Sequence, residues 1–272
     1  IIATNYTVTN KEKEVFWAGK ADDPDYRVTT DWGAVDGYHH PSRFAGRHFV
    51  QTNPSDCTND AVNSARNSGW FLGTMGARRA ITFLEQQPQV DKDRIGVYGM
   101  SMGAKLTVLT AGSDSRVKAA SPACGGLSDL SVKGRTLPPI ADDEYLKRIT
   151  CPTIIMSPSN DFHSNVQDIP QAVKDIKSRD WRVVSSPNRN HGDSSEYSVG
   201  ALLWFNQFLK REFTMAKTPT TRLTLKTADN VPSVSVTSDQ SQMIQSVNVY
   251  YTQGGERKPA EKYWRVARPV DK

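Results

Sequence analysis

The sequence predicts an α/β protein, in which helices cover both faces of a mostly parallel sheet, followed by a small all-β domain. Short apolar runs alternate with segments of helical periodicity up to about residue 211, which is typical of parallel strands joined by crossover helices. Near residue 213 this pattern changes to alternating apolar and polar residues with turn signals and no helical signal. We therefore expect a first domain over residues 1–212 and a small β domain over residues 213–272.

The elements of the first domain follow from local periodicity. Residues 1–6 are apolar and β-branched enough for a short buried strand, whereas the polar stretch that follows, to about residue 66, has little periodicity. Helices are expected over residues 69–87, 104–111, 171–179 and 196–211. Further strands are expected over residues 94–98, 117–121, 153–156 and 182–185. The second domain contains the alternating runs RLTLKT, PSVSVTS and SVNVYYT.

Composition excludes several classes of protein. The net charge is +5, from 34 basic and 29 acidic residues, but the basic residues are scattered, so we expect no nucleic-acid partner. The sequence contains no run of eighteen or more apolar residues, so we expect no membrane span. The three cysteines, Cys57, Cys124 and Cys151, have neither CxxC nor Cys/His spacing. We therefore expect no metal site and no cofactor.

The strongest chemical signal is the segment Gly99-Met100-Ser101-Met102-Gly103, between an expected strand and an expected helix. In this context a GxSxG segment is typical of a nucleophile elbow, a tight turn that presents a serine hydroxyl above the edge of a sheet. We expect that a Cβ at Gly99 or Gly103 would collide with the neighbouring strand and helix. The backbone N–H of Met102, at the start of the next helix, is then the candidate donor to an oxyanion.

A serine needs a base, and the base needs an orienting carboxylate. In this type of fold they follow in the order serine, acid, histidine, and only His163 and His191 come after Ser101. Asp161 follows the strand expected at 153–156, and His191 follows the next expected strand, so both belong at the sheet edge that carries Ser101. We therefore predict Asp161 as the acid and His191 as the base.

Other titratable residues remain open as alternatives. His163, two residues from Asp161, is a candidate to line the substrate pocket and a weaker candidate for the base. Asp193 is close to His191 in sequence, but a carboxylate two residues away seldom reaches the Nδ1 atom of its own histidine. His39 and His40 precede the elbow and are candidates only for substrate contact. Met100 and Met102 suggest either an adaptable apolar acyl pocket or simple packing beneath the elbow.

Taken together, these segments resemble the α/β-hydrolase superfamily, in particular its dienelactone hydrolase-like and acetyl xylan esterase-like branch. The resemblance covers about residues 1–211. It is carried by segments in a specific order: Asp31-Trp-Gly-Ala34, Asn67-Ser-Gly-Trp70, Ala77-Arg-Arg-Ala80 with ITFLEQQPQVD, RIGVYGMSMGAKLT, Arg116-Val-Lys-Ala-Ala, Cys124-Gly-Gly126, Ser159-Asn-Asp161-Phe-His163 and Asn190-His191.

The resemblance implies an α/β-hydrolase fold and a serine esterase with Ser101 as nucleophile, Asp161 as acid and His191 as base. It further implies acetylated polysaccharide or oligosaccharide as substrate, and a periplasmic or secreted location. One departure is that nothing in residues 1–98 matches the Gly-rich loop that supplies the second oxyanion donor in this family, and we expect that strands upstream of residue 1 are missing from the sequence. The oligomeric state is left open.

Two other functions remain possible on the sequence alone. One is a serine peptidase of the prolyl-oligopeptidase type, which has the same elbow and triad. The other is a catalytically weak polysaccharide-binding protein, in which Trp264, Tyr250 and Tyr251 of the β domain stack on sugars. For the aromatic residues, packing in a core is the alternative to sugar binding.

Overall fold

The computed structural model describes residues 7–10, 13–16, 69–129, 140–192, 194–241, 243–253 and 261–267. The strand expected over residues 1–6 lies outside these ranges. The first two described strands, β1 (Thr7–Asn10) and β2 (Lys13–Phe16), form an antiparallel pair. Within the described part of the chain, no helix is both long enough and apolar enough to cross a membrane.

A four-stranded parallel sheet forms the centre of the molecule, as the sequence predicted. Its strands are β3 (Gly96–Met100), β4 (Ala119–Ala123), β5 (Thr153–Met156) and β6 (Trp181–Val184), and they lie side by side in chain order. Gly99 pairs with Pro122 and Met156 with Val184, so the carboxyl ends of the strands meet at one edge. Loops that leave this edge are therefore brought close together.

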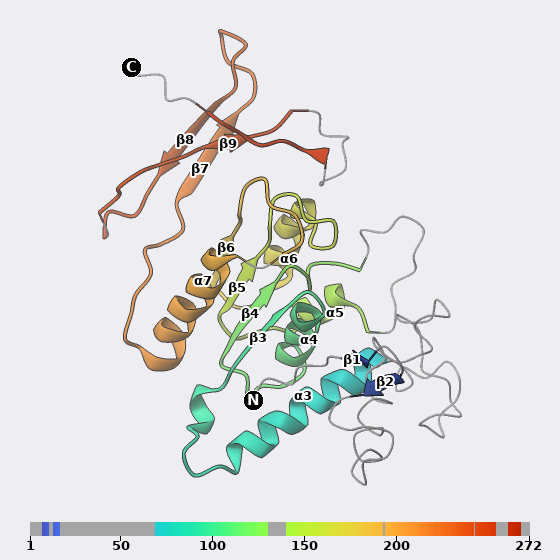
Figure 1. Cartoon of the computed structure of the whole chain (residues 1–272). Helices are drawn as coiled ribbons and strands as arrows, with labels where there is room; N and C mark the ends of the chain where they lie inside the picture. The colour runs from blue at the N-terminus through green and yellow to red at the C-terminus, as the bar shows by residue number, and fades with distance from the viewer. Residues whose placement is uncertain are drawn as a thin grey trace.

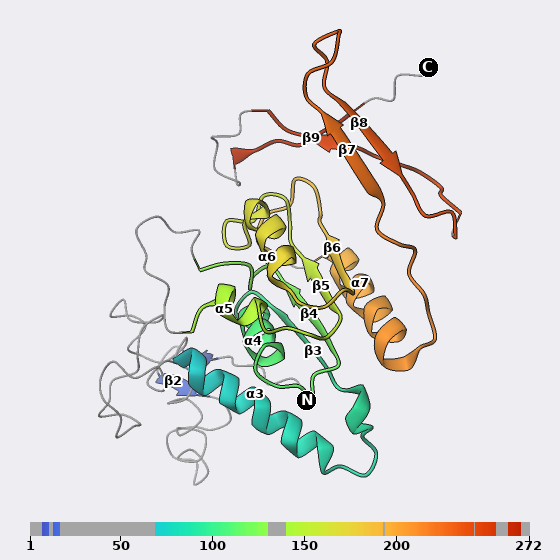
Figure 2. The ribbon, with the colours of Figure 1, turned by 180° about the vertical axis from the view of Figure 1, so that it is seen from behind.

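Helices cover both faces of this sheet (Figures 1 and 2). On one face lies α7 (Ser195–Phe205), which a five-residue π-helical segment, Asn206–Lys210, extends. On the other face lie α4 (Met102–Ala111), α5 (Asp142–Leu146) and α6 (Ile169–Asp175), and α3 (Gly69–Glu85) packs against α4.

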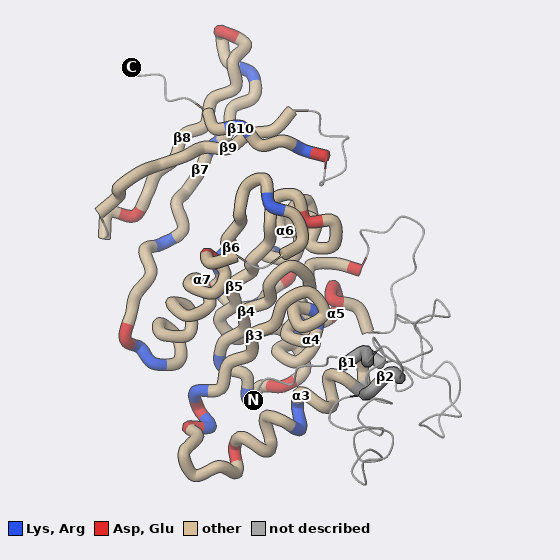
Figure 3. Tube along the Cα trace, viewed as in Figure 1, with Lys and Arg blue, Asp and Glu red and all other residues tan. Residues whose placement is uncertain are grey.

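Successive side chains of β5 point to opposite faces of the sheet, so helices must bury apolar residues on both faces. Ile154 and Met156 pack against α7, whereas Ile155 packs in the core on the opposite face. All four residues of β5 are buried, and β3, β4 and β5 carry no Lys, Arg, Asp or Glu (Figure 3). Strands that are apolar on both faces are typical of a parallel sheet between helical layers.

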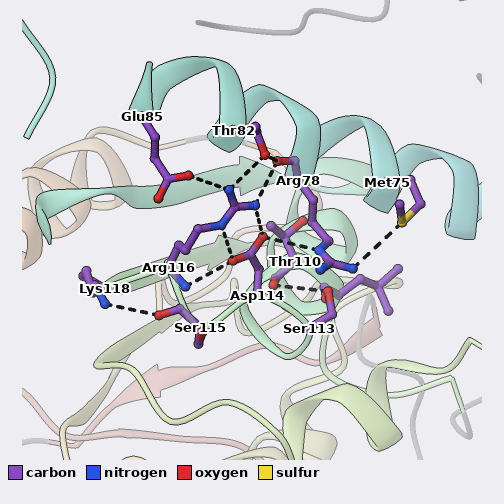
Figure 4. A network of polar contacts seen from close by, with 11 residues as sticks. Met75, Arg78, Thr82, Glu85, Thr110, Ser113, Asp114, Ser115, Arg116 and Lys118 are labelled. Carbon is purple, nitrogen blue, oxygen red and sulfur yellow. Dashed lines mark hydrogen bonds and ion pairs between the residues drawn. The ribbon is translucent and has the colours of Figure 1, made fainter. Parts of the chain in front are cut away.

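A polar network attaches α3 to the turn between α4 and β4 (Figure 4). Arg116 is at its centre: its guanidinium donates to Asp114 at 2.6 Å and to Glu85 at 2.6 Å. Arg78 of α3 contacts the same Asp114 at 3.3 Å. The Asp114 carboxylate is almost completely enclosed, and hydrogen bonds from Arg116 lower its pKa below the ordinary value for an aspartate. The network thus fixes the end of α4 that is remote from Ser101.

After the π-helical segment, the described residues form short antiparallel strands joined by turns and irregular segments, as expected for a small β domain. β7 (Thr220–Thr224) and β8 (Ser233–Thr237) form one antiparallel pair. β9 (Tyr250–Tyr251) and β10 (Arg265–Val266) form another. In both views these strands lie at one end of the parallel sheet, beside the loop after β6 (Figures 1 and 2). The boundary at residue 212 stays a prediction.

Two strands begin later than their sequence indicated. The expectations at residues 94–98 and 117–121 were each two residues early, because β3 runs over 96–100 and β4 over 119–123. Ile95 and Val117 are apolar and buried, but they lie in the turns before the strands. A buried apolar residue in a tight turn has the same sequence signature as the first residue of a strand. The short helix α5 was not expected at all.

Candidate active site

Ser101 lies on a strained turn between β3 and α4. Its φ of 57° and ψ of −113° are outside the regions that non-glycine residues prefer, as is usual for a functional residue held by its surroundings. A Cβ at Gly99 would lie 2.3 Å from the carbonyl oxygen of Gly103, so only glycine fits there. The expectation for Gly103 was wrong: among the described residues, a Cβ at this position meets nothing within 4 Å. The backbone of Gly103 makes the close contact with Gly99, and this contact does not require position 103 to lack a side chain.

The turn is attached to the neighbouring strand as well. The Ser101 N–H donates to the carbonyl oxygen of Ala123, at the end of β4, at 2.7 Å. Gly125, just beyond, passes so close that a Cβ there would lie 2.7 Å from the Ser101 carbonyl oxygen. Met102 is the first residue of α4, and an N–H at this position has no acceptor within its own helix. This geometry leaves the Met102 N–H available to an anionic atom at the helix N-terminus.

Three side chains from three loops form one hydrogen-bonded chain. The His191 Nε2 atom lies 2.8 Å from the Ser101 Oγ atom. The His191 Nδ1 atom lies 3.0 and 3.1 Å from the two carboxylate oxygens of Asp161. Asp161 belongs to the loop after β5, His191 to the loop after β6, and Ser101 to the turn after β3. An imidazole between a hydroxyl and a carboxylate can take up the hydroxyl proton while the carboxylate fixes its orientation.

Asp161 is completely buried, which is unfavourable for a carboxylate unless it is hydrogen-bonded. Its Oδ1 atom accepts the backbone N–H of His163 at 2.7 Å and that of Ser164 at 2.9 Å. With the His191 ring, the carboxylate has three hydrogen-bond partners among the residues that the structure describes. The loop therefore folds around the carboxylate and fixes its direction, whereas the His191 side chain keeps about one fifth of its surface exposed.

Two aromatic rings lie beside His191. The Phe162 ring centroid is 4.9 Å from that of His191, and the His163 centroid is 5.8 Å from it, edge-on. Phe162 is 70% exposed, so it presents an apolar surface next to the imidazole. Partial burial lowers the pKa of His163. Because the residue is also partly exposed, solvent weakens this effect. Neither residue hydrogen-bonds to Ser101, and the substrate-binding role of His163 stays a prediction.

Some of the residues singled out in the sequence cannot be compared with the structure. His39, His40 and Asp193 lie outside the described residues, as does most of residues 1–98, the region in which a second oxyanion donor was sought. Met100 and Met102 can be compared. Met100 packs against the apolar cluster beneath α7, and Met102 packs against the cluster of Trp70, Leu109 and Ile140. Of the two interpretations of these methionines, these contacts favour packing.

A buried ionic cluster that the sequence analysis missed lies on α4, one turn after the elbow. The Lys105 Nζ atom contacts Asp129 at 2.6 Å and Asp142 at 3.0 Å, and it lies over the Trp70 ring at 5.3 Å. The Asp143 carboxylate accepts the Asp129 N–H at 2.9 Å, which joins the end of the β4 loop to the start of α5. A lysine within the apolar segment GAKLTVLTA was the available signal.

Burial and ion pairing act in opposite directions on the pKa values of this cluster. It raises the pKa of Asp142 to about 6, against the opposing effect of Lys105. Burial alone would lower the pKa of Lys105, but the charges of Asp142 and Asp129 outweigh burial and the pKa is raised. The cluster holds one cation and three carboxylates. Among the residues that the structure describes, no group of three or more His, Cys, Asp or Glu side chains is arranged to hold a metal ion.

Comparison with known proteins identifies a family. The family model "Dienelactone hydrolase family" matches residues 49–199, which includes the elbow and the loops of Asp161 and His191. None of the curated proteins matches the chain.

Several solved structures are similar to the chain. One is an acetyl xylan esterase from Paenibacillus sp. R4, with 18% identity and a TM-score of 0.48, over 54% of this chain and 55% of that one. Another is acetyl xylan esterase 1 from Thermoanaerobacterium sp. JW/SL YS485, with 18% identity and a TM-score of 0.43, over 54% and 59%. A third is an acylaminoacyl peptidase from Pyrococcus horikoshii, with 16% identity and a TM-score of 0.43, over 55% and 29%. The matched part of the chain thus corresponds to 55% and 59% of the two esterases.

Proposed function

Because this chain belongs to the dienelactone hydrolase family, an α/β-hydrolase family as the sequence predicted, we propose that it is a serine carboxylic-ester hydrolase that uses Ser101, His191 and Asp161. One observation carries the proposal, namely the continuous hydrogen-bonded chain from the Ser101 hydroxyl through the His191 ring to the Asp161 carboxylate. In addition, the strained backbone of Ser101 is the conformation that a nucleophile elbow needs.

In the first step, Ser101 Oγ attacks the ester carbonyl carbon while His191 Nε2 takes up the hydroxyl proton. The carbonyl oxygen becomes an oxyanion, to which the N–H of Met102 donates a hydrogen bond at the N-terminus of α4. Asp161 orients the ring and stabilises the imidazolium that forms. His191 then gives the proton to the alkoxide leaving group, and the acyl group stays on Ser101.

In the second step, His191 takes a proton from a water molecule, which attacks the acyl carbon. Collapse of the second tetrahedral intermediate returns the proton to Ser101 and releases the carboxylic acid. Phe162 lies beside the imidazole and is 70% exposed, so a substrate that approaches Ser101 past His191 would meet its apolar ring. His163 is the next side chain along the same loop and part of the proposed substrate surface.

For the substrate, we propose acetyl esters of polysaccharides or oligosaccharides, as the sequence resemblance implies. A periplasmic or secreted location belongs to the same proposal. Ester and peptide-amide substrates should be compared directly, because a serine peptidase uses the same three groups.

The experiment that tests the proposal is labelling with a fluorophosphonate probe, followed by peptide mapping, alongside hydrolysis of p-nitrophenyl acetate. We expect the label on Ser101 and a loss of roughly 10⁴-fold or more in kcat for Ser101→Ala. Ser115→Ala is the matched control, because Ser115 is exposed and lies in the turn after α4. Activity retained by folded Ser101→Ala would reject Ser101 as the nucleophile.

A further inference from the structure

The loops that carry Asp161 and His191 are both attached to a segment near the end of the chain. The Asn188 side-chain amide pairs with the backbone of Trp264: its Oδ1 atom accepts the Trp264 N–H at 2.7 Å, and its Nδ2 atom donates to the Trp264 carbonyl at 2.9 Å. The Asn160 Nδ2 atom donates to the carbonyl oxygen of Lys262. We call residues 261–267 the C-terminal strap. Asn188 and Trp264 are 76 residues apart in the sequence, and Asn160 and Lys262 are 102 residues apart.

The two asparagines also connect the loops to each other. The Ser159 hydroxyl donates to Asn160 Oδ1 at 2.6 Å and accepts the Asn188 N–H at 2.9 Å. The Asn160 N–H donates to the carbonyl oxygen of Arg189 at 2.9 Å. The strap therefore binds a single polar network that spans both loops. Asn160 directly precedes Asp161, and Asn188 is three residues before His191.

The strap is itself held in place by burial at Lys262 and by strand pairing at Arg265 and Val266. Lys262 is buried, with 8% of its surface exposed. Beyond it, Arg265 pairs with Tyr251 and Val266 with Tyr250, which joins the strap to the rest of the C-terminal β region. Its contacts to the loops use its backbone groups, so they depend on where the strap lies and not on which side chains it carries.

We propose that the strap orients the acid and base loops, with Asn160 and Asn188 as positioning residues for the Asp161–His191 pair. This inference rests on the proposed function. Asp161 and His191 come from different loops, and the distances of 2.8 to 3.1 Å along the chain of three side chains hold only if both loops keep their relative positions. A displacement of about 1 Å in a catalytic group can lower the rate about 10²-fold. The C-terminal β region thus contributes to catalysis without contacting the reacting atoms.

Asn188 allows a clean test because its backbone has a φ of 58°, which glycine adopts without strain. Asn188→Gly removes both strap contacts but keeps this backbone conformation. Asn230→Gly is the matched control, since Asn230 has a φ of 54° and lies in the exposed turn between β7 and β8. Asn160→Ala removes the other contact and decides the matter if Asn188→Gly does not fold.

Three experiments are done on wild type and variants: steady-state kinetics of p-nitrophenyl acetate hydrolysis for kcat and KM, the rate at which Ser101 takes up the fluorophosphonate label, and amide hydrogen exchange. For Asn188→Gly and Asn160→Ala we expect kcat and the labelling rate to fall about 10- to 100-fold, with KM within about twofold of wild type. Exchange should rise in residues 157–163 and 186–192. Asn230→Gly should match the wild type in all three.

Unchanged exchange in both loops would overturn the strap as an ordering element. Increased exchange with wild-type kcat would overturn its role in positioning, and a raised KM with unchanged kcat would make it part of the substrate-binding surface instead. The proposed function fails separately, and is recognised by a wild-type protein that neither hydrolyses the ester nor takes up the label. In that case the catalytic role of the strap is overturned with it, whatever the exchange shows.

Discussion

The two β regions of this protein differ in how they are held. Every residue of β4 and β5 is buried between helical layers, whereas every residue of β8, and all but one residue of β7, is exposed. An isolated two-stranded pair is marginally stable in water. The parallel sheet thus determines where Ser101, Asp161 and His191 lie, whereas the C-terminal strands are attached to that part of the molecule by polar contacts such as those of Asn160 and Asn188.

The two regions differ because the parallel sheet buries its apolar side chains away from water, whereas the β7–β8 pair leaves its own exposed. Ile154, Ile155 and Met156 are almost completely inaccessible, and each contributes on the order of 1.5–3 kcal/mol through burial. Leu223 and Leu225, in and just after β7, are 63% and 67% exposed and contribute little of this kind. Stability should therefore respond strongly to changes in the parallel sheet and weakly to changes in the β7–β8 pair.

The largest effect is expected at the end of β3. Gly99→Ala would bring a Cβ within 2.3 Å of the Gly103 carbonyl oxygen, a backbone atom that cannot move without displacing α4. We expect a loss of about 4 kcal/mol or more in the free energy of unfolding, measured by urea denaturation. Gly103→Ala is the control, and we expect a soluble, folded protein because the described surroundings leave room. Equal loss in both variants would contradict this account of the elbow.

The same truncation at the centre of each sheet compares the two regions directly. Ile154→Ala in β5 removes a completely buried side chain, and we expect a loss of about 2–5 kcal/mol. Leu223→Ala in β7 removes an exposed one, and we expect a change within about 0.5 kcal/mol. Denaturant unfolding of both variants measures the difference. A large loss for Leu223→Ala would mean that the β7–β8 pair has an apolar partner in solution.

Two aspartates, Asp142 beside the parallel sheet and Asp239 in the C-terminal β region, should contribute to stability with opposite dependences on pH. Burial raises the pKa of Asp142 to about 6, above the ordinary value of 3.8. The folded state then binds the proton more readily than the unfolded state, so the contribution of Asp142 to stability falls as the pH rises from about 4 to about 6. Hydrogen bonds from the backbone of Lys217 and Ser241 lower the pKa of Asp239, whose contribution to stability is present above pH 3.8 and is lost as the pH falls below it.

The test is the difference in unfolding free energy between wild type and each Asp→Asn variant at pH 4.5 and pH 7. Asp142→Asn should gain stability relative to wild type over this range, at no more than about 1.4 kcal/mol per pH unit. Lys105 keeps its contact with Asp129 in that variant. Asp239→Asn should be less stable than wild type by nearly the same amount at both pH values. A pH-independent difference for Asp142→Asn would show that burial does not control this carboxyl group.

The smallest effect concerns exposed aromatic rings. Phe162→Ala removes the ring beside His191, and we expect kcat/KM for the ester to fall roughly 2- to 10-fold, the range of about 0.5–1.5 kcal/mol typical of an aromatic contact. The unfolding free energy should hardly change, because Phe162 is 70% exposed. Phe83→Ala in α3 is the control, because Phe83 is also an exposed ring, at 51%, and we expect no effect on the ester. Equal activity of Phe162→Ala and wild type would remove Phe162 from the substrate surface.

Local patterns carried much of the information about the site. The GxSxG segment lies between a strand and a helix in the structure, and the strand expected over residues 153–156 has the same bounds there. The order of serine, acid and histidine, together with their positions after expected strands, selected Asp161 and His191, whose side chains lie within hydrogen-bonding distance of each other. Element boundaries were less accurate, since an apolar residue in a turn cannot be distinguished from one in a strand by periodicity. The helix expected to continue to residue 211 changes to π-helical geometry after Phe205.

What the sequence determined by itself was the alternation of strands and helices, the change to β structure after α7, and the position of Ser101 in a turn between a strand and a helix, because each of these depends on residues close together in the chain. The tertiary structure alone decided that Lys105 meets Asp129 and Asp142, that Phe162 lies against His191, and that Asn188 pairs with Trp264. Periodicity carries no information about such contacts. They depend on how separately formed elements pack, and a side chain finds its partner only when that packing has brought distant segments together.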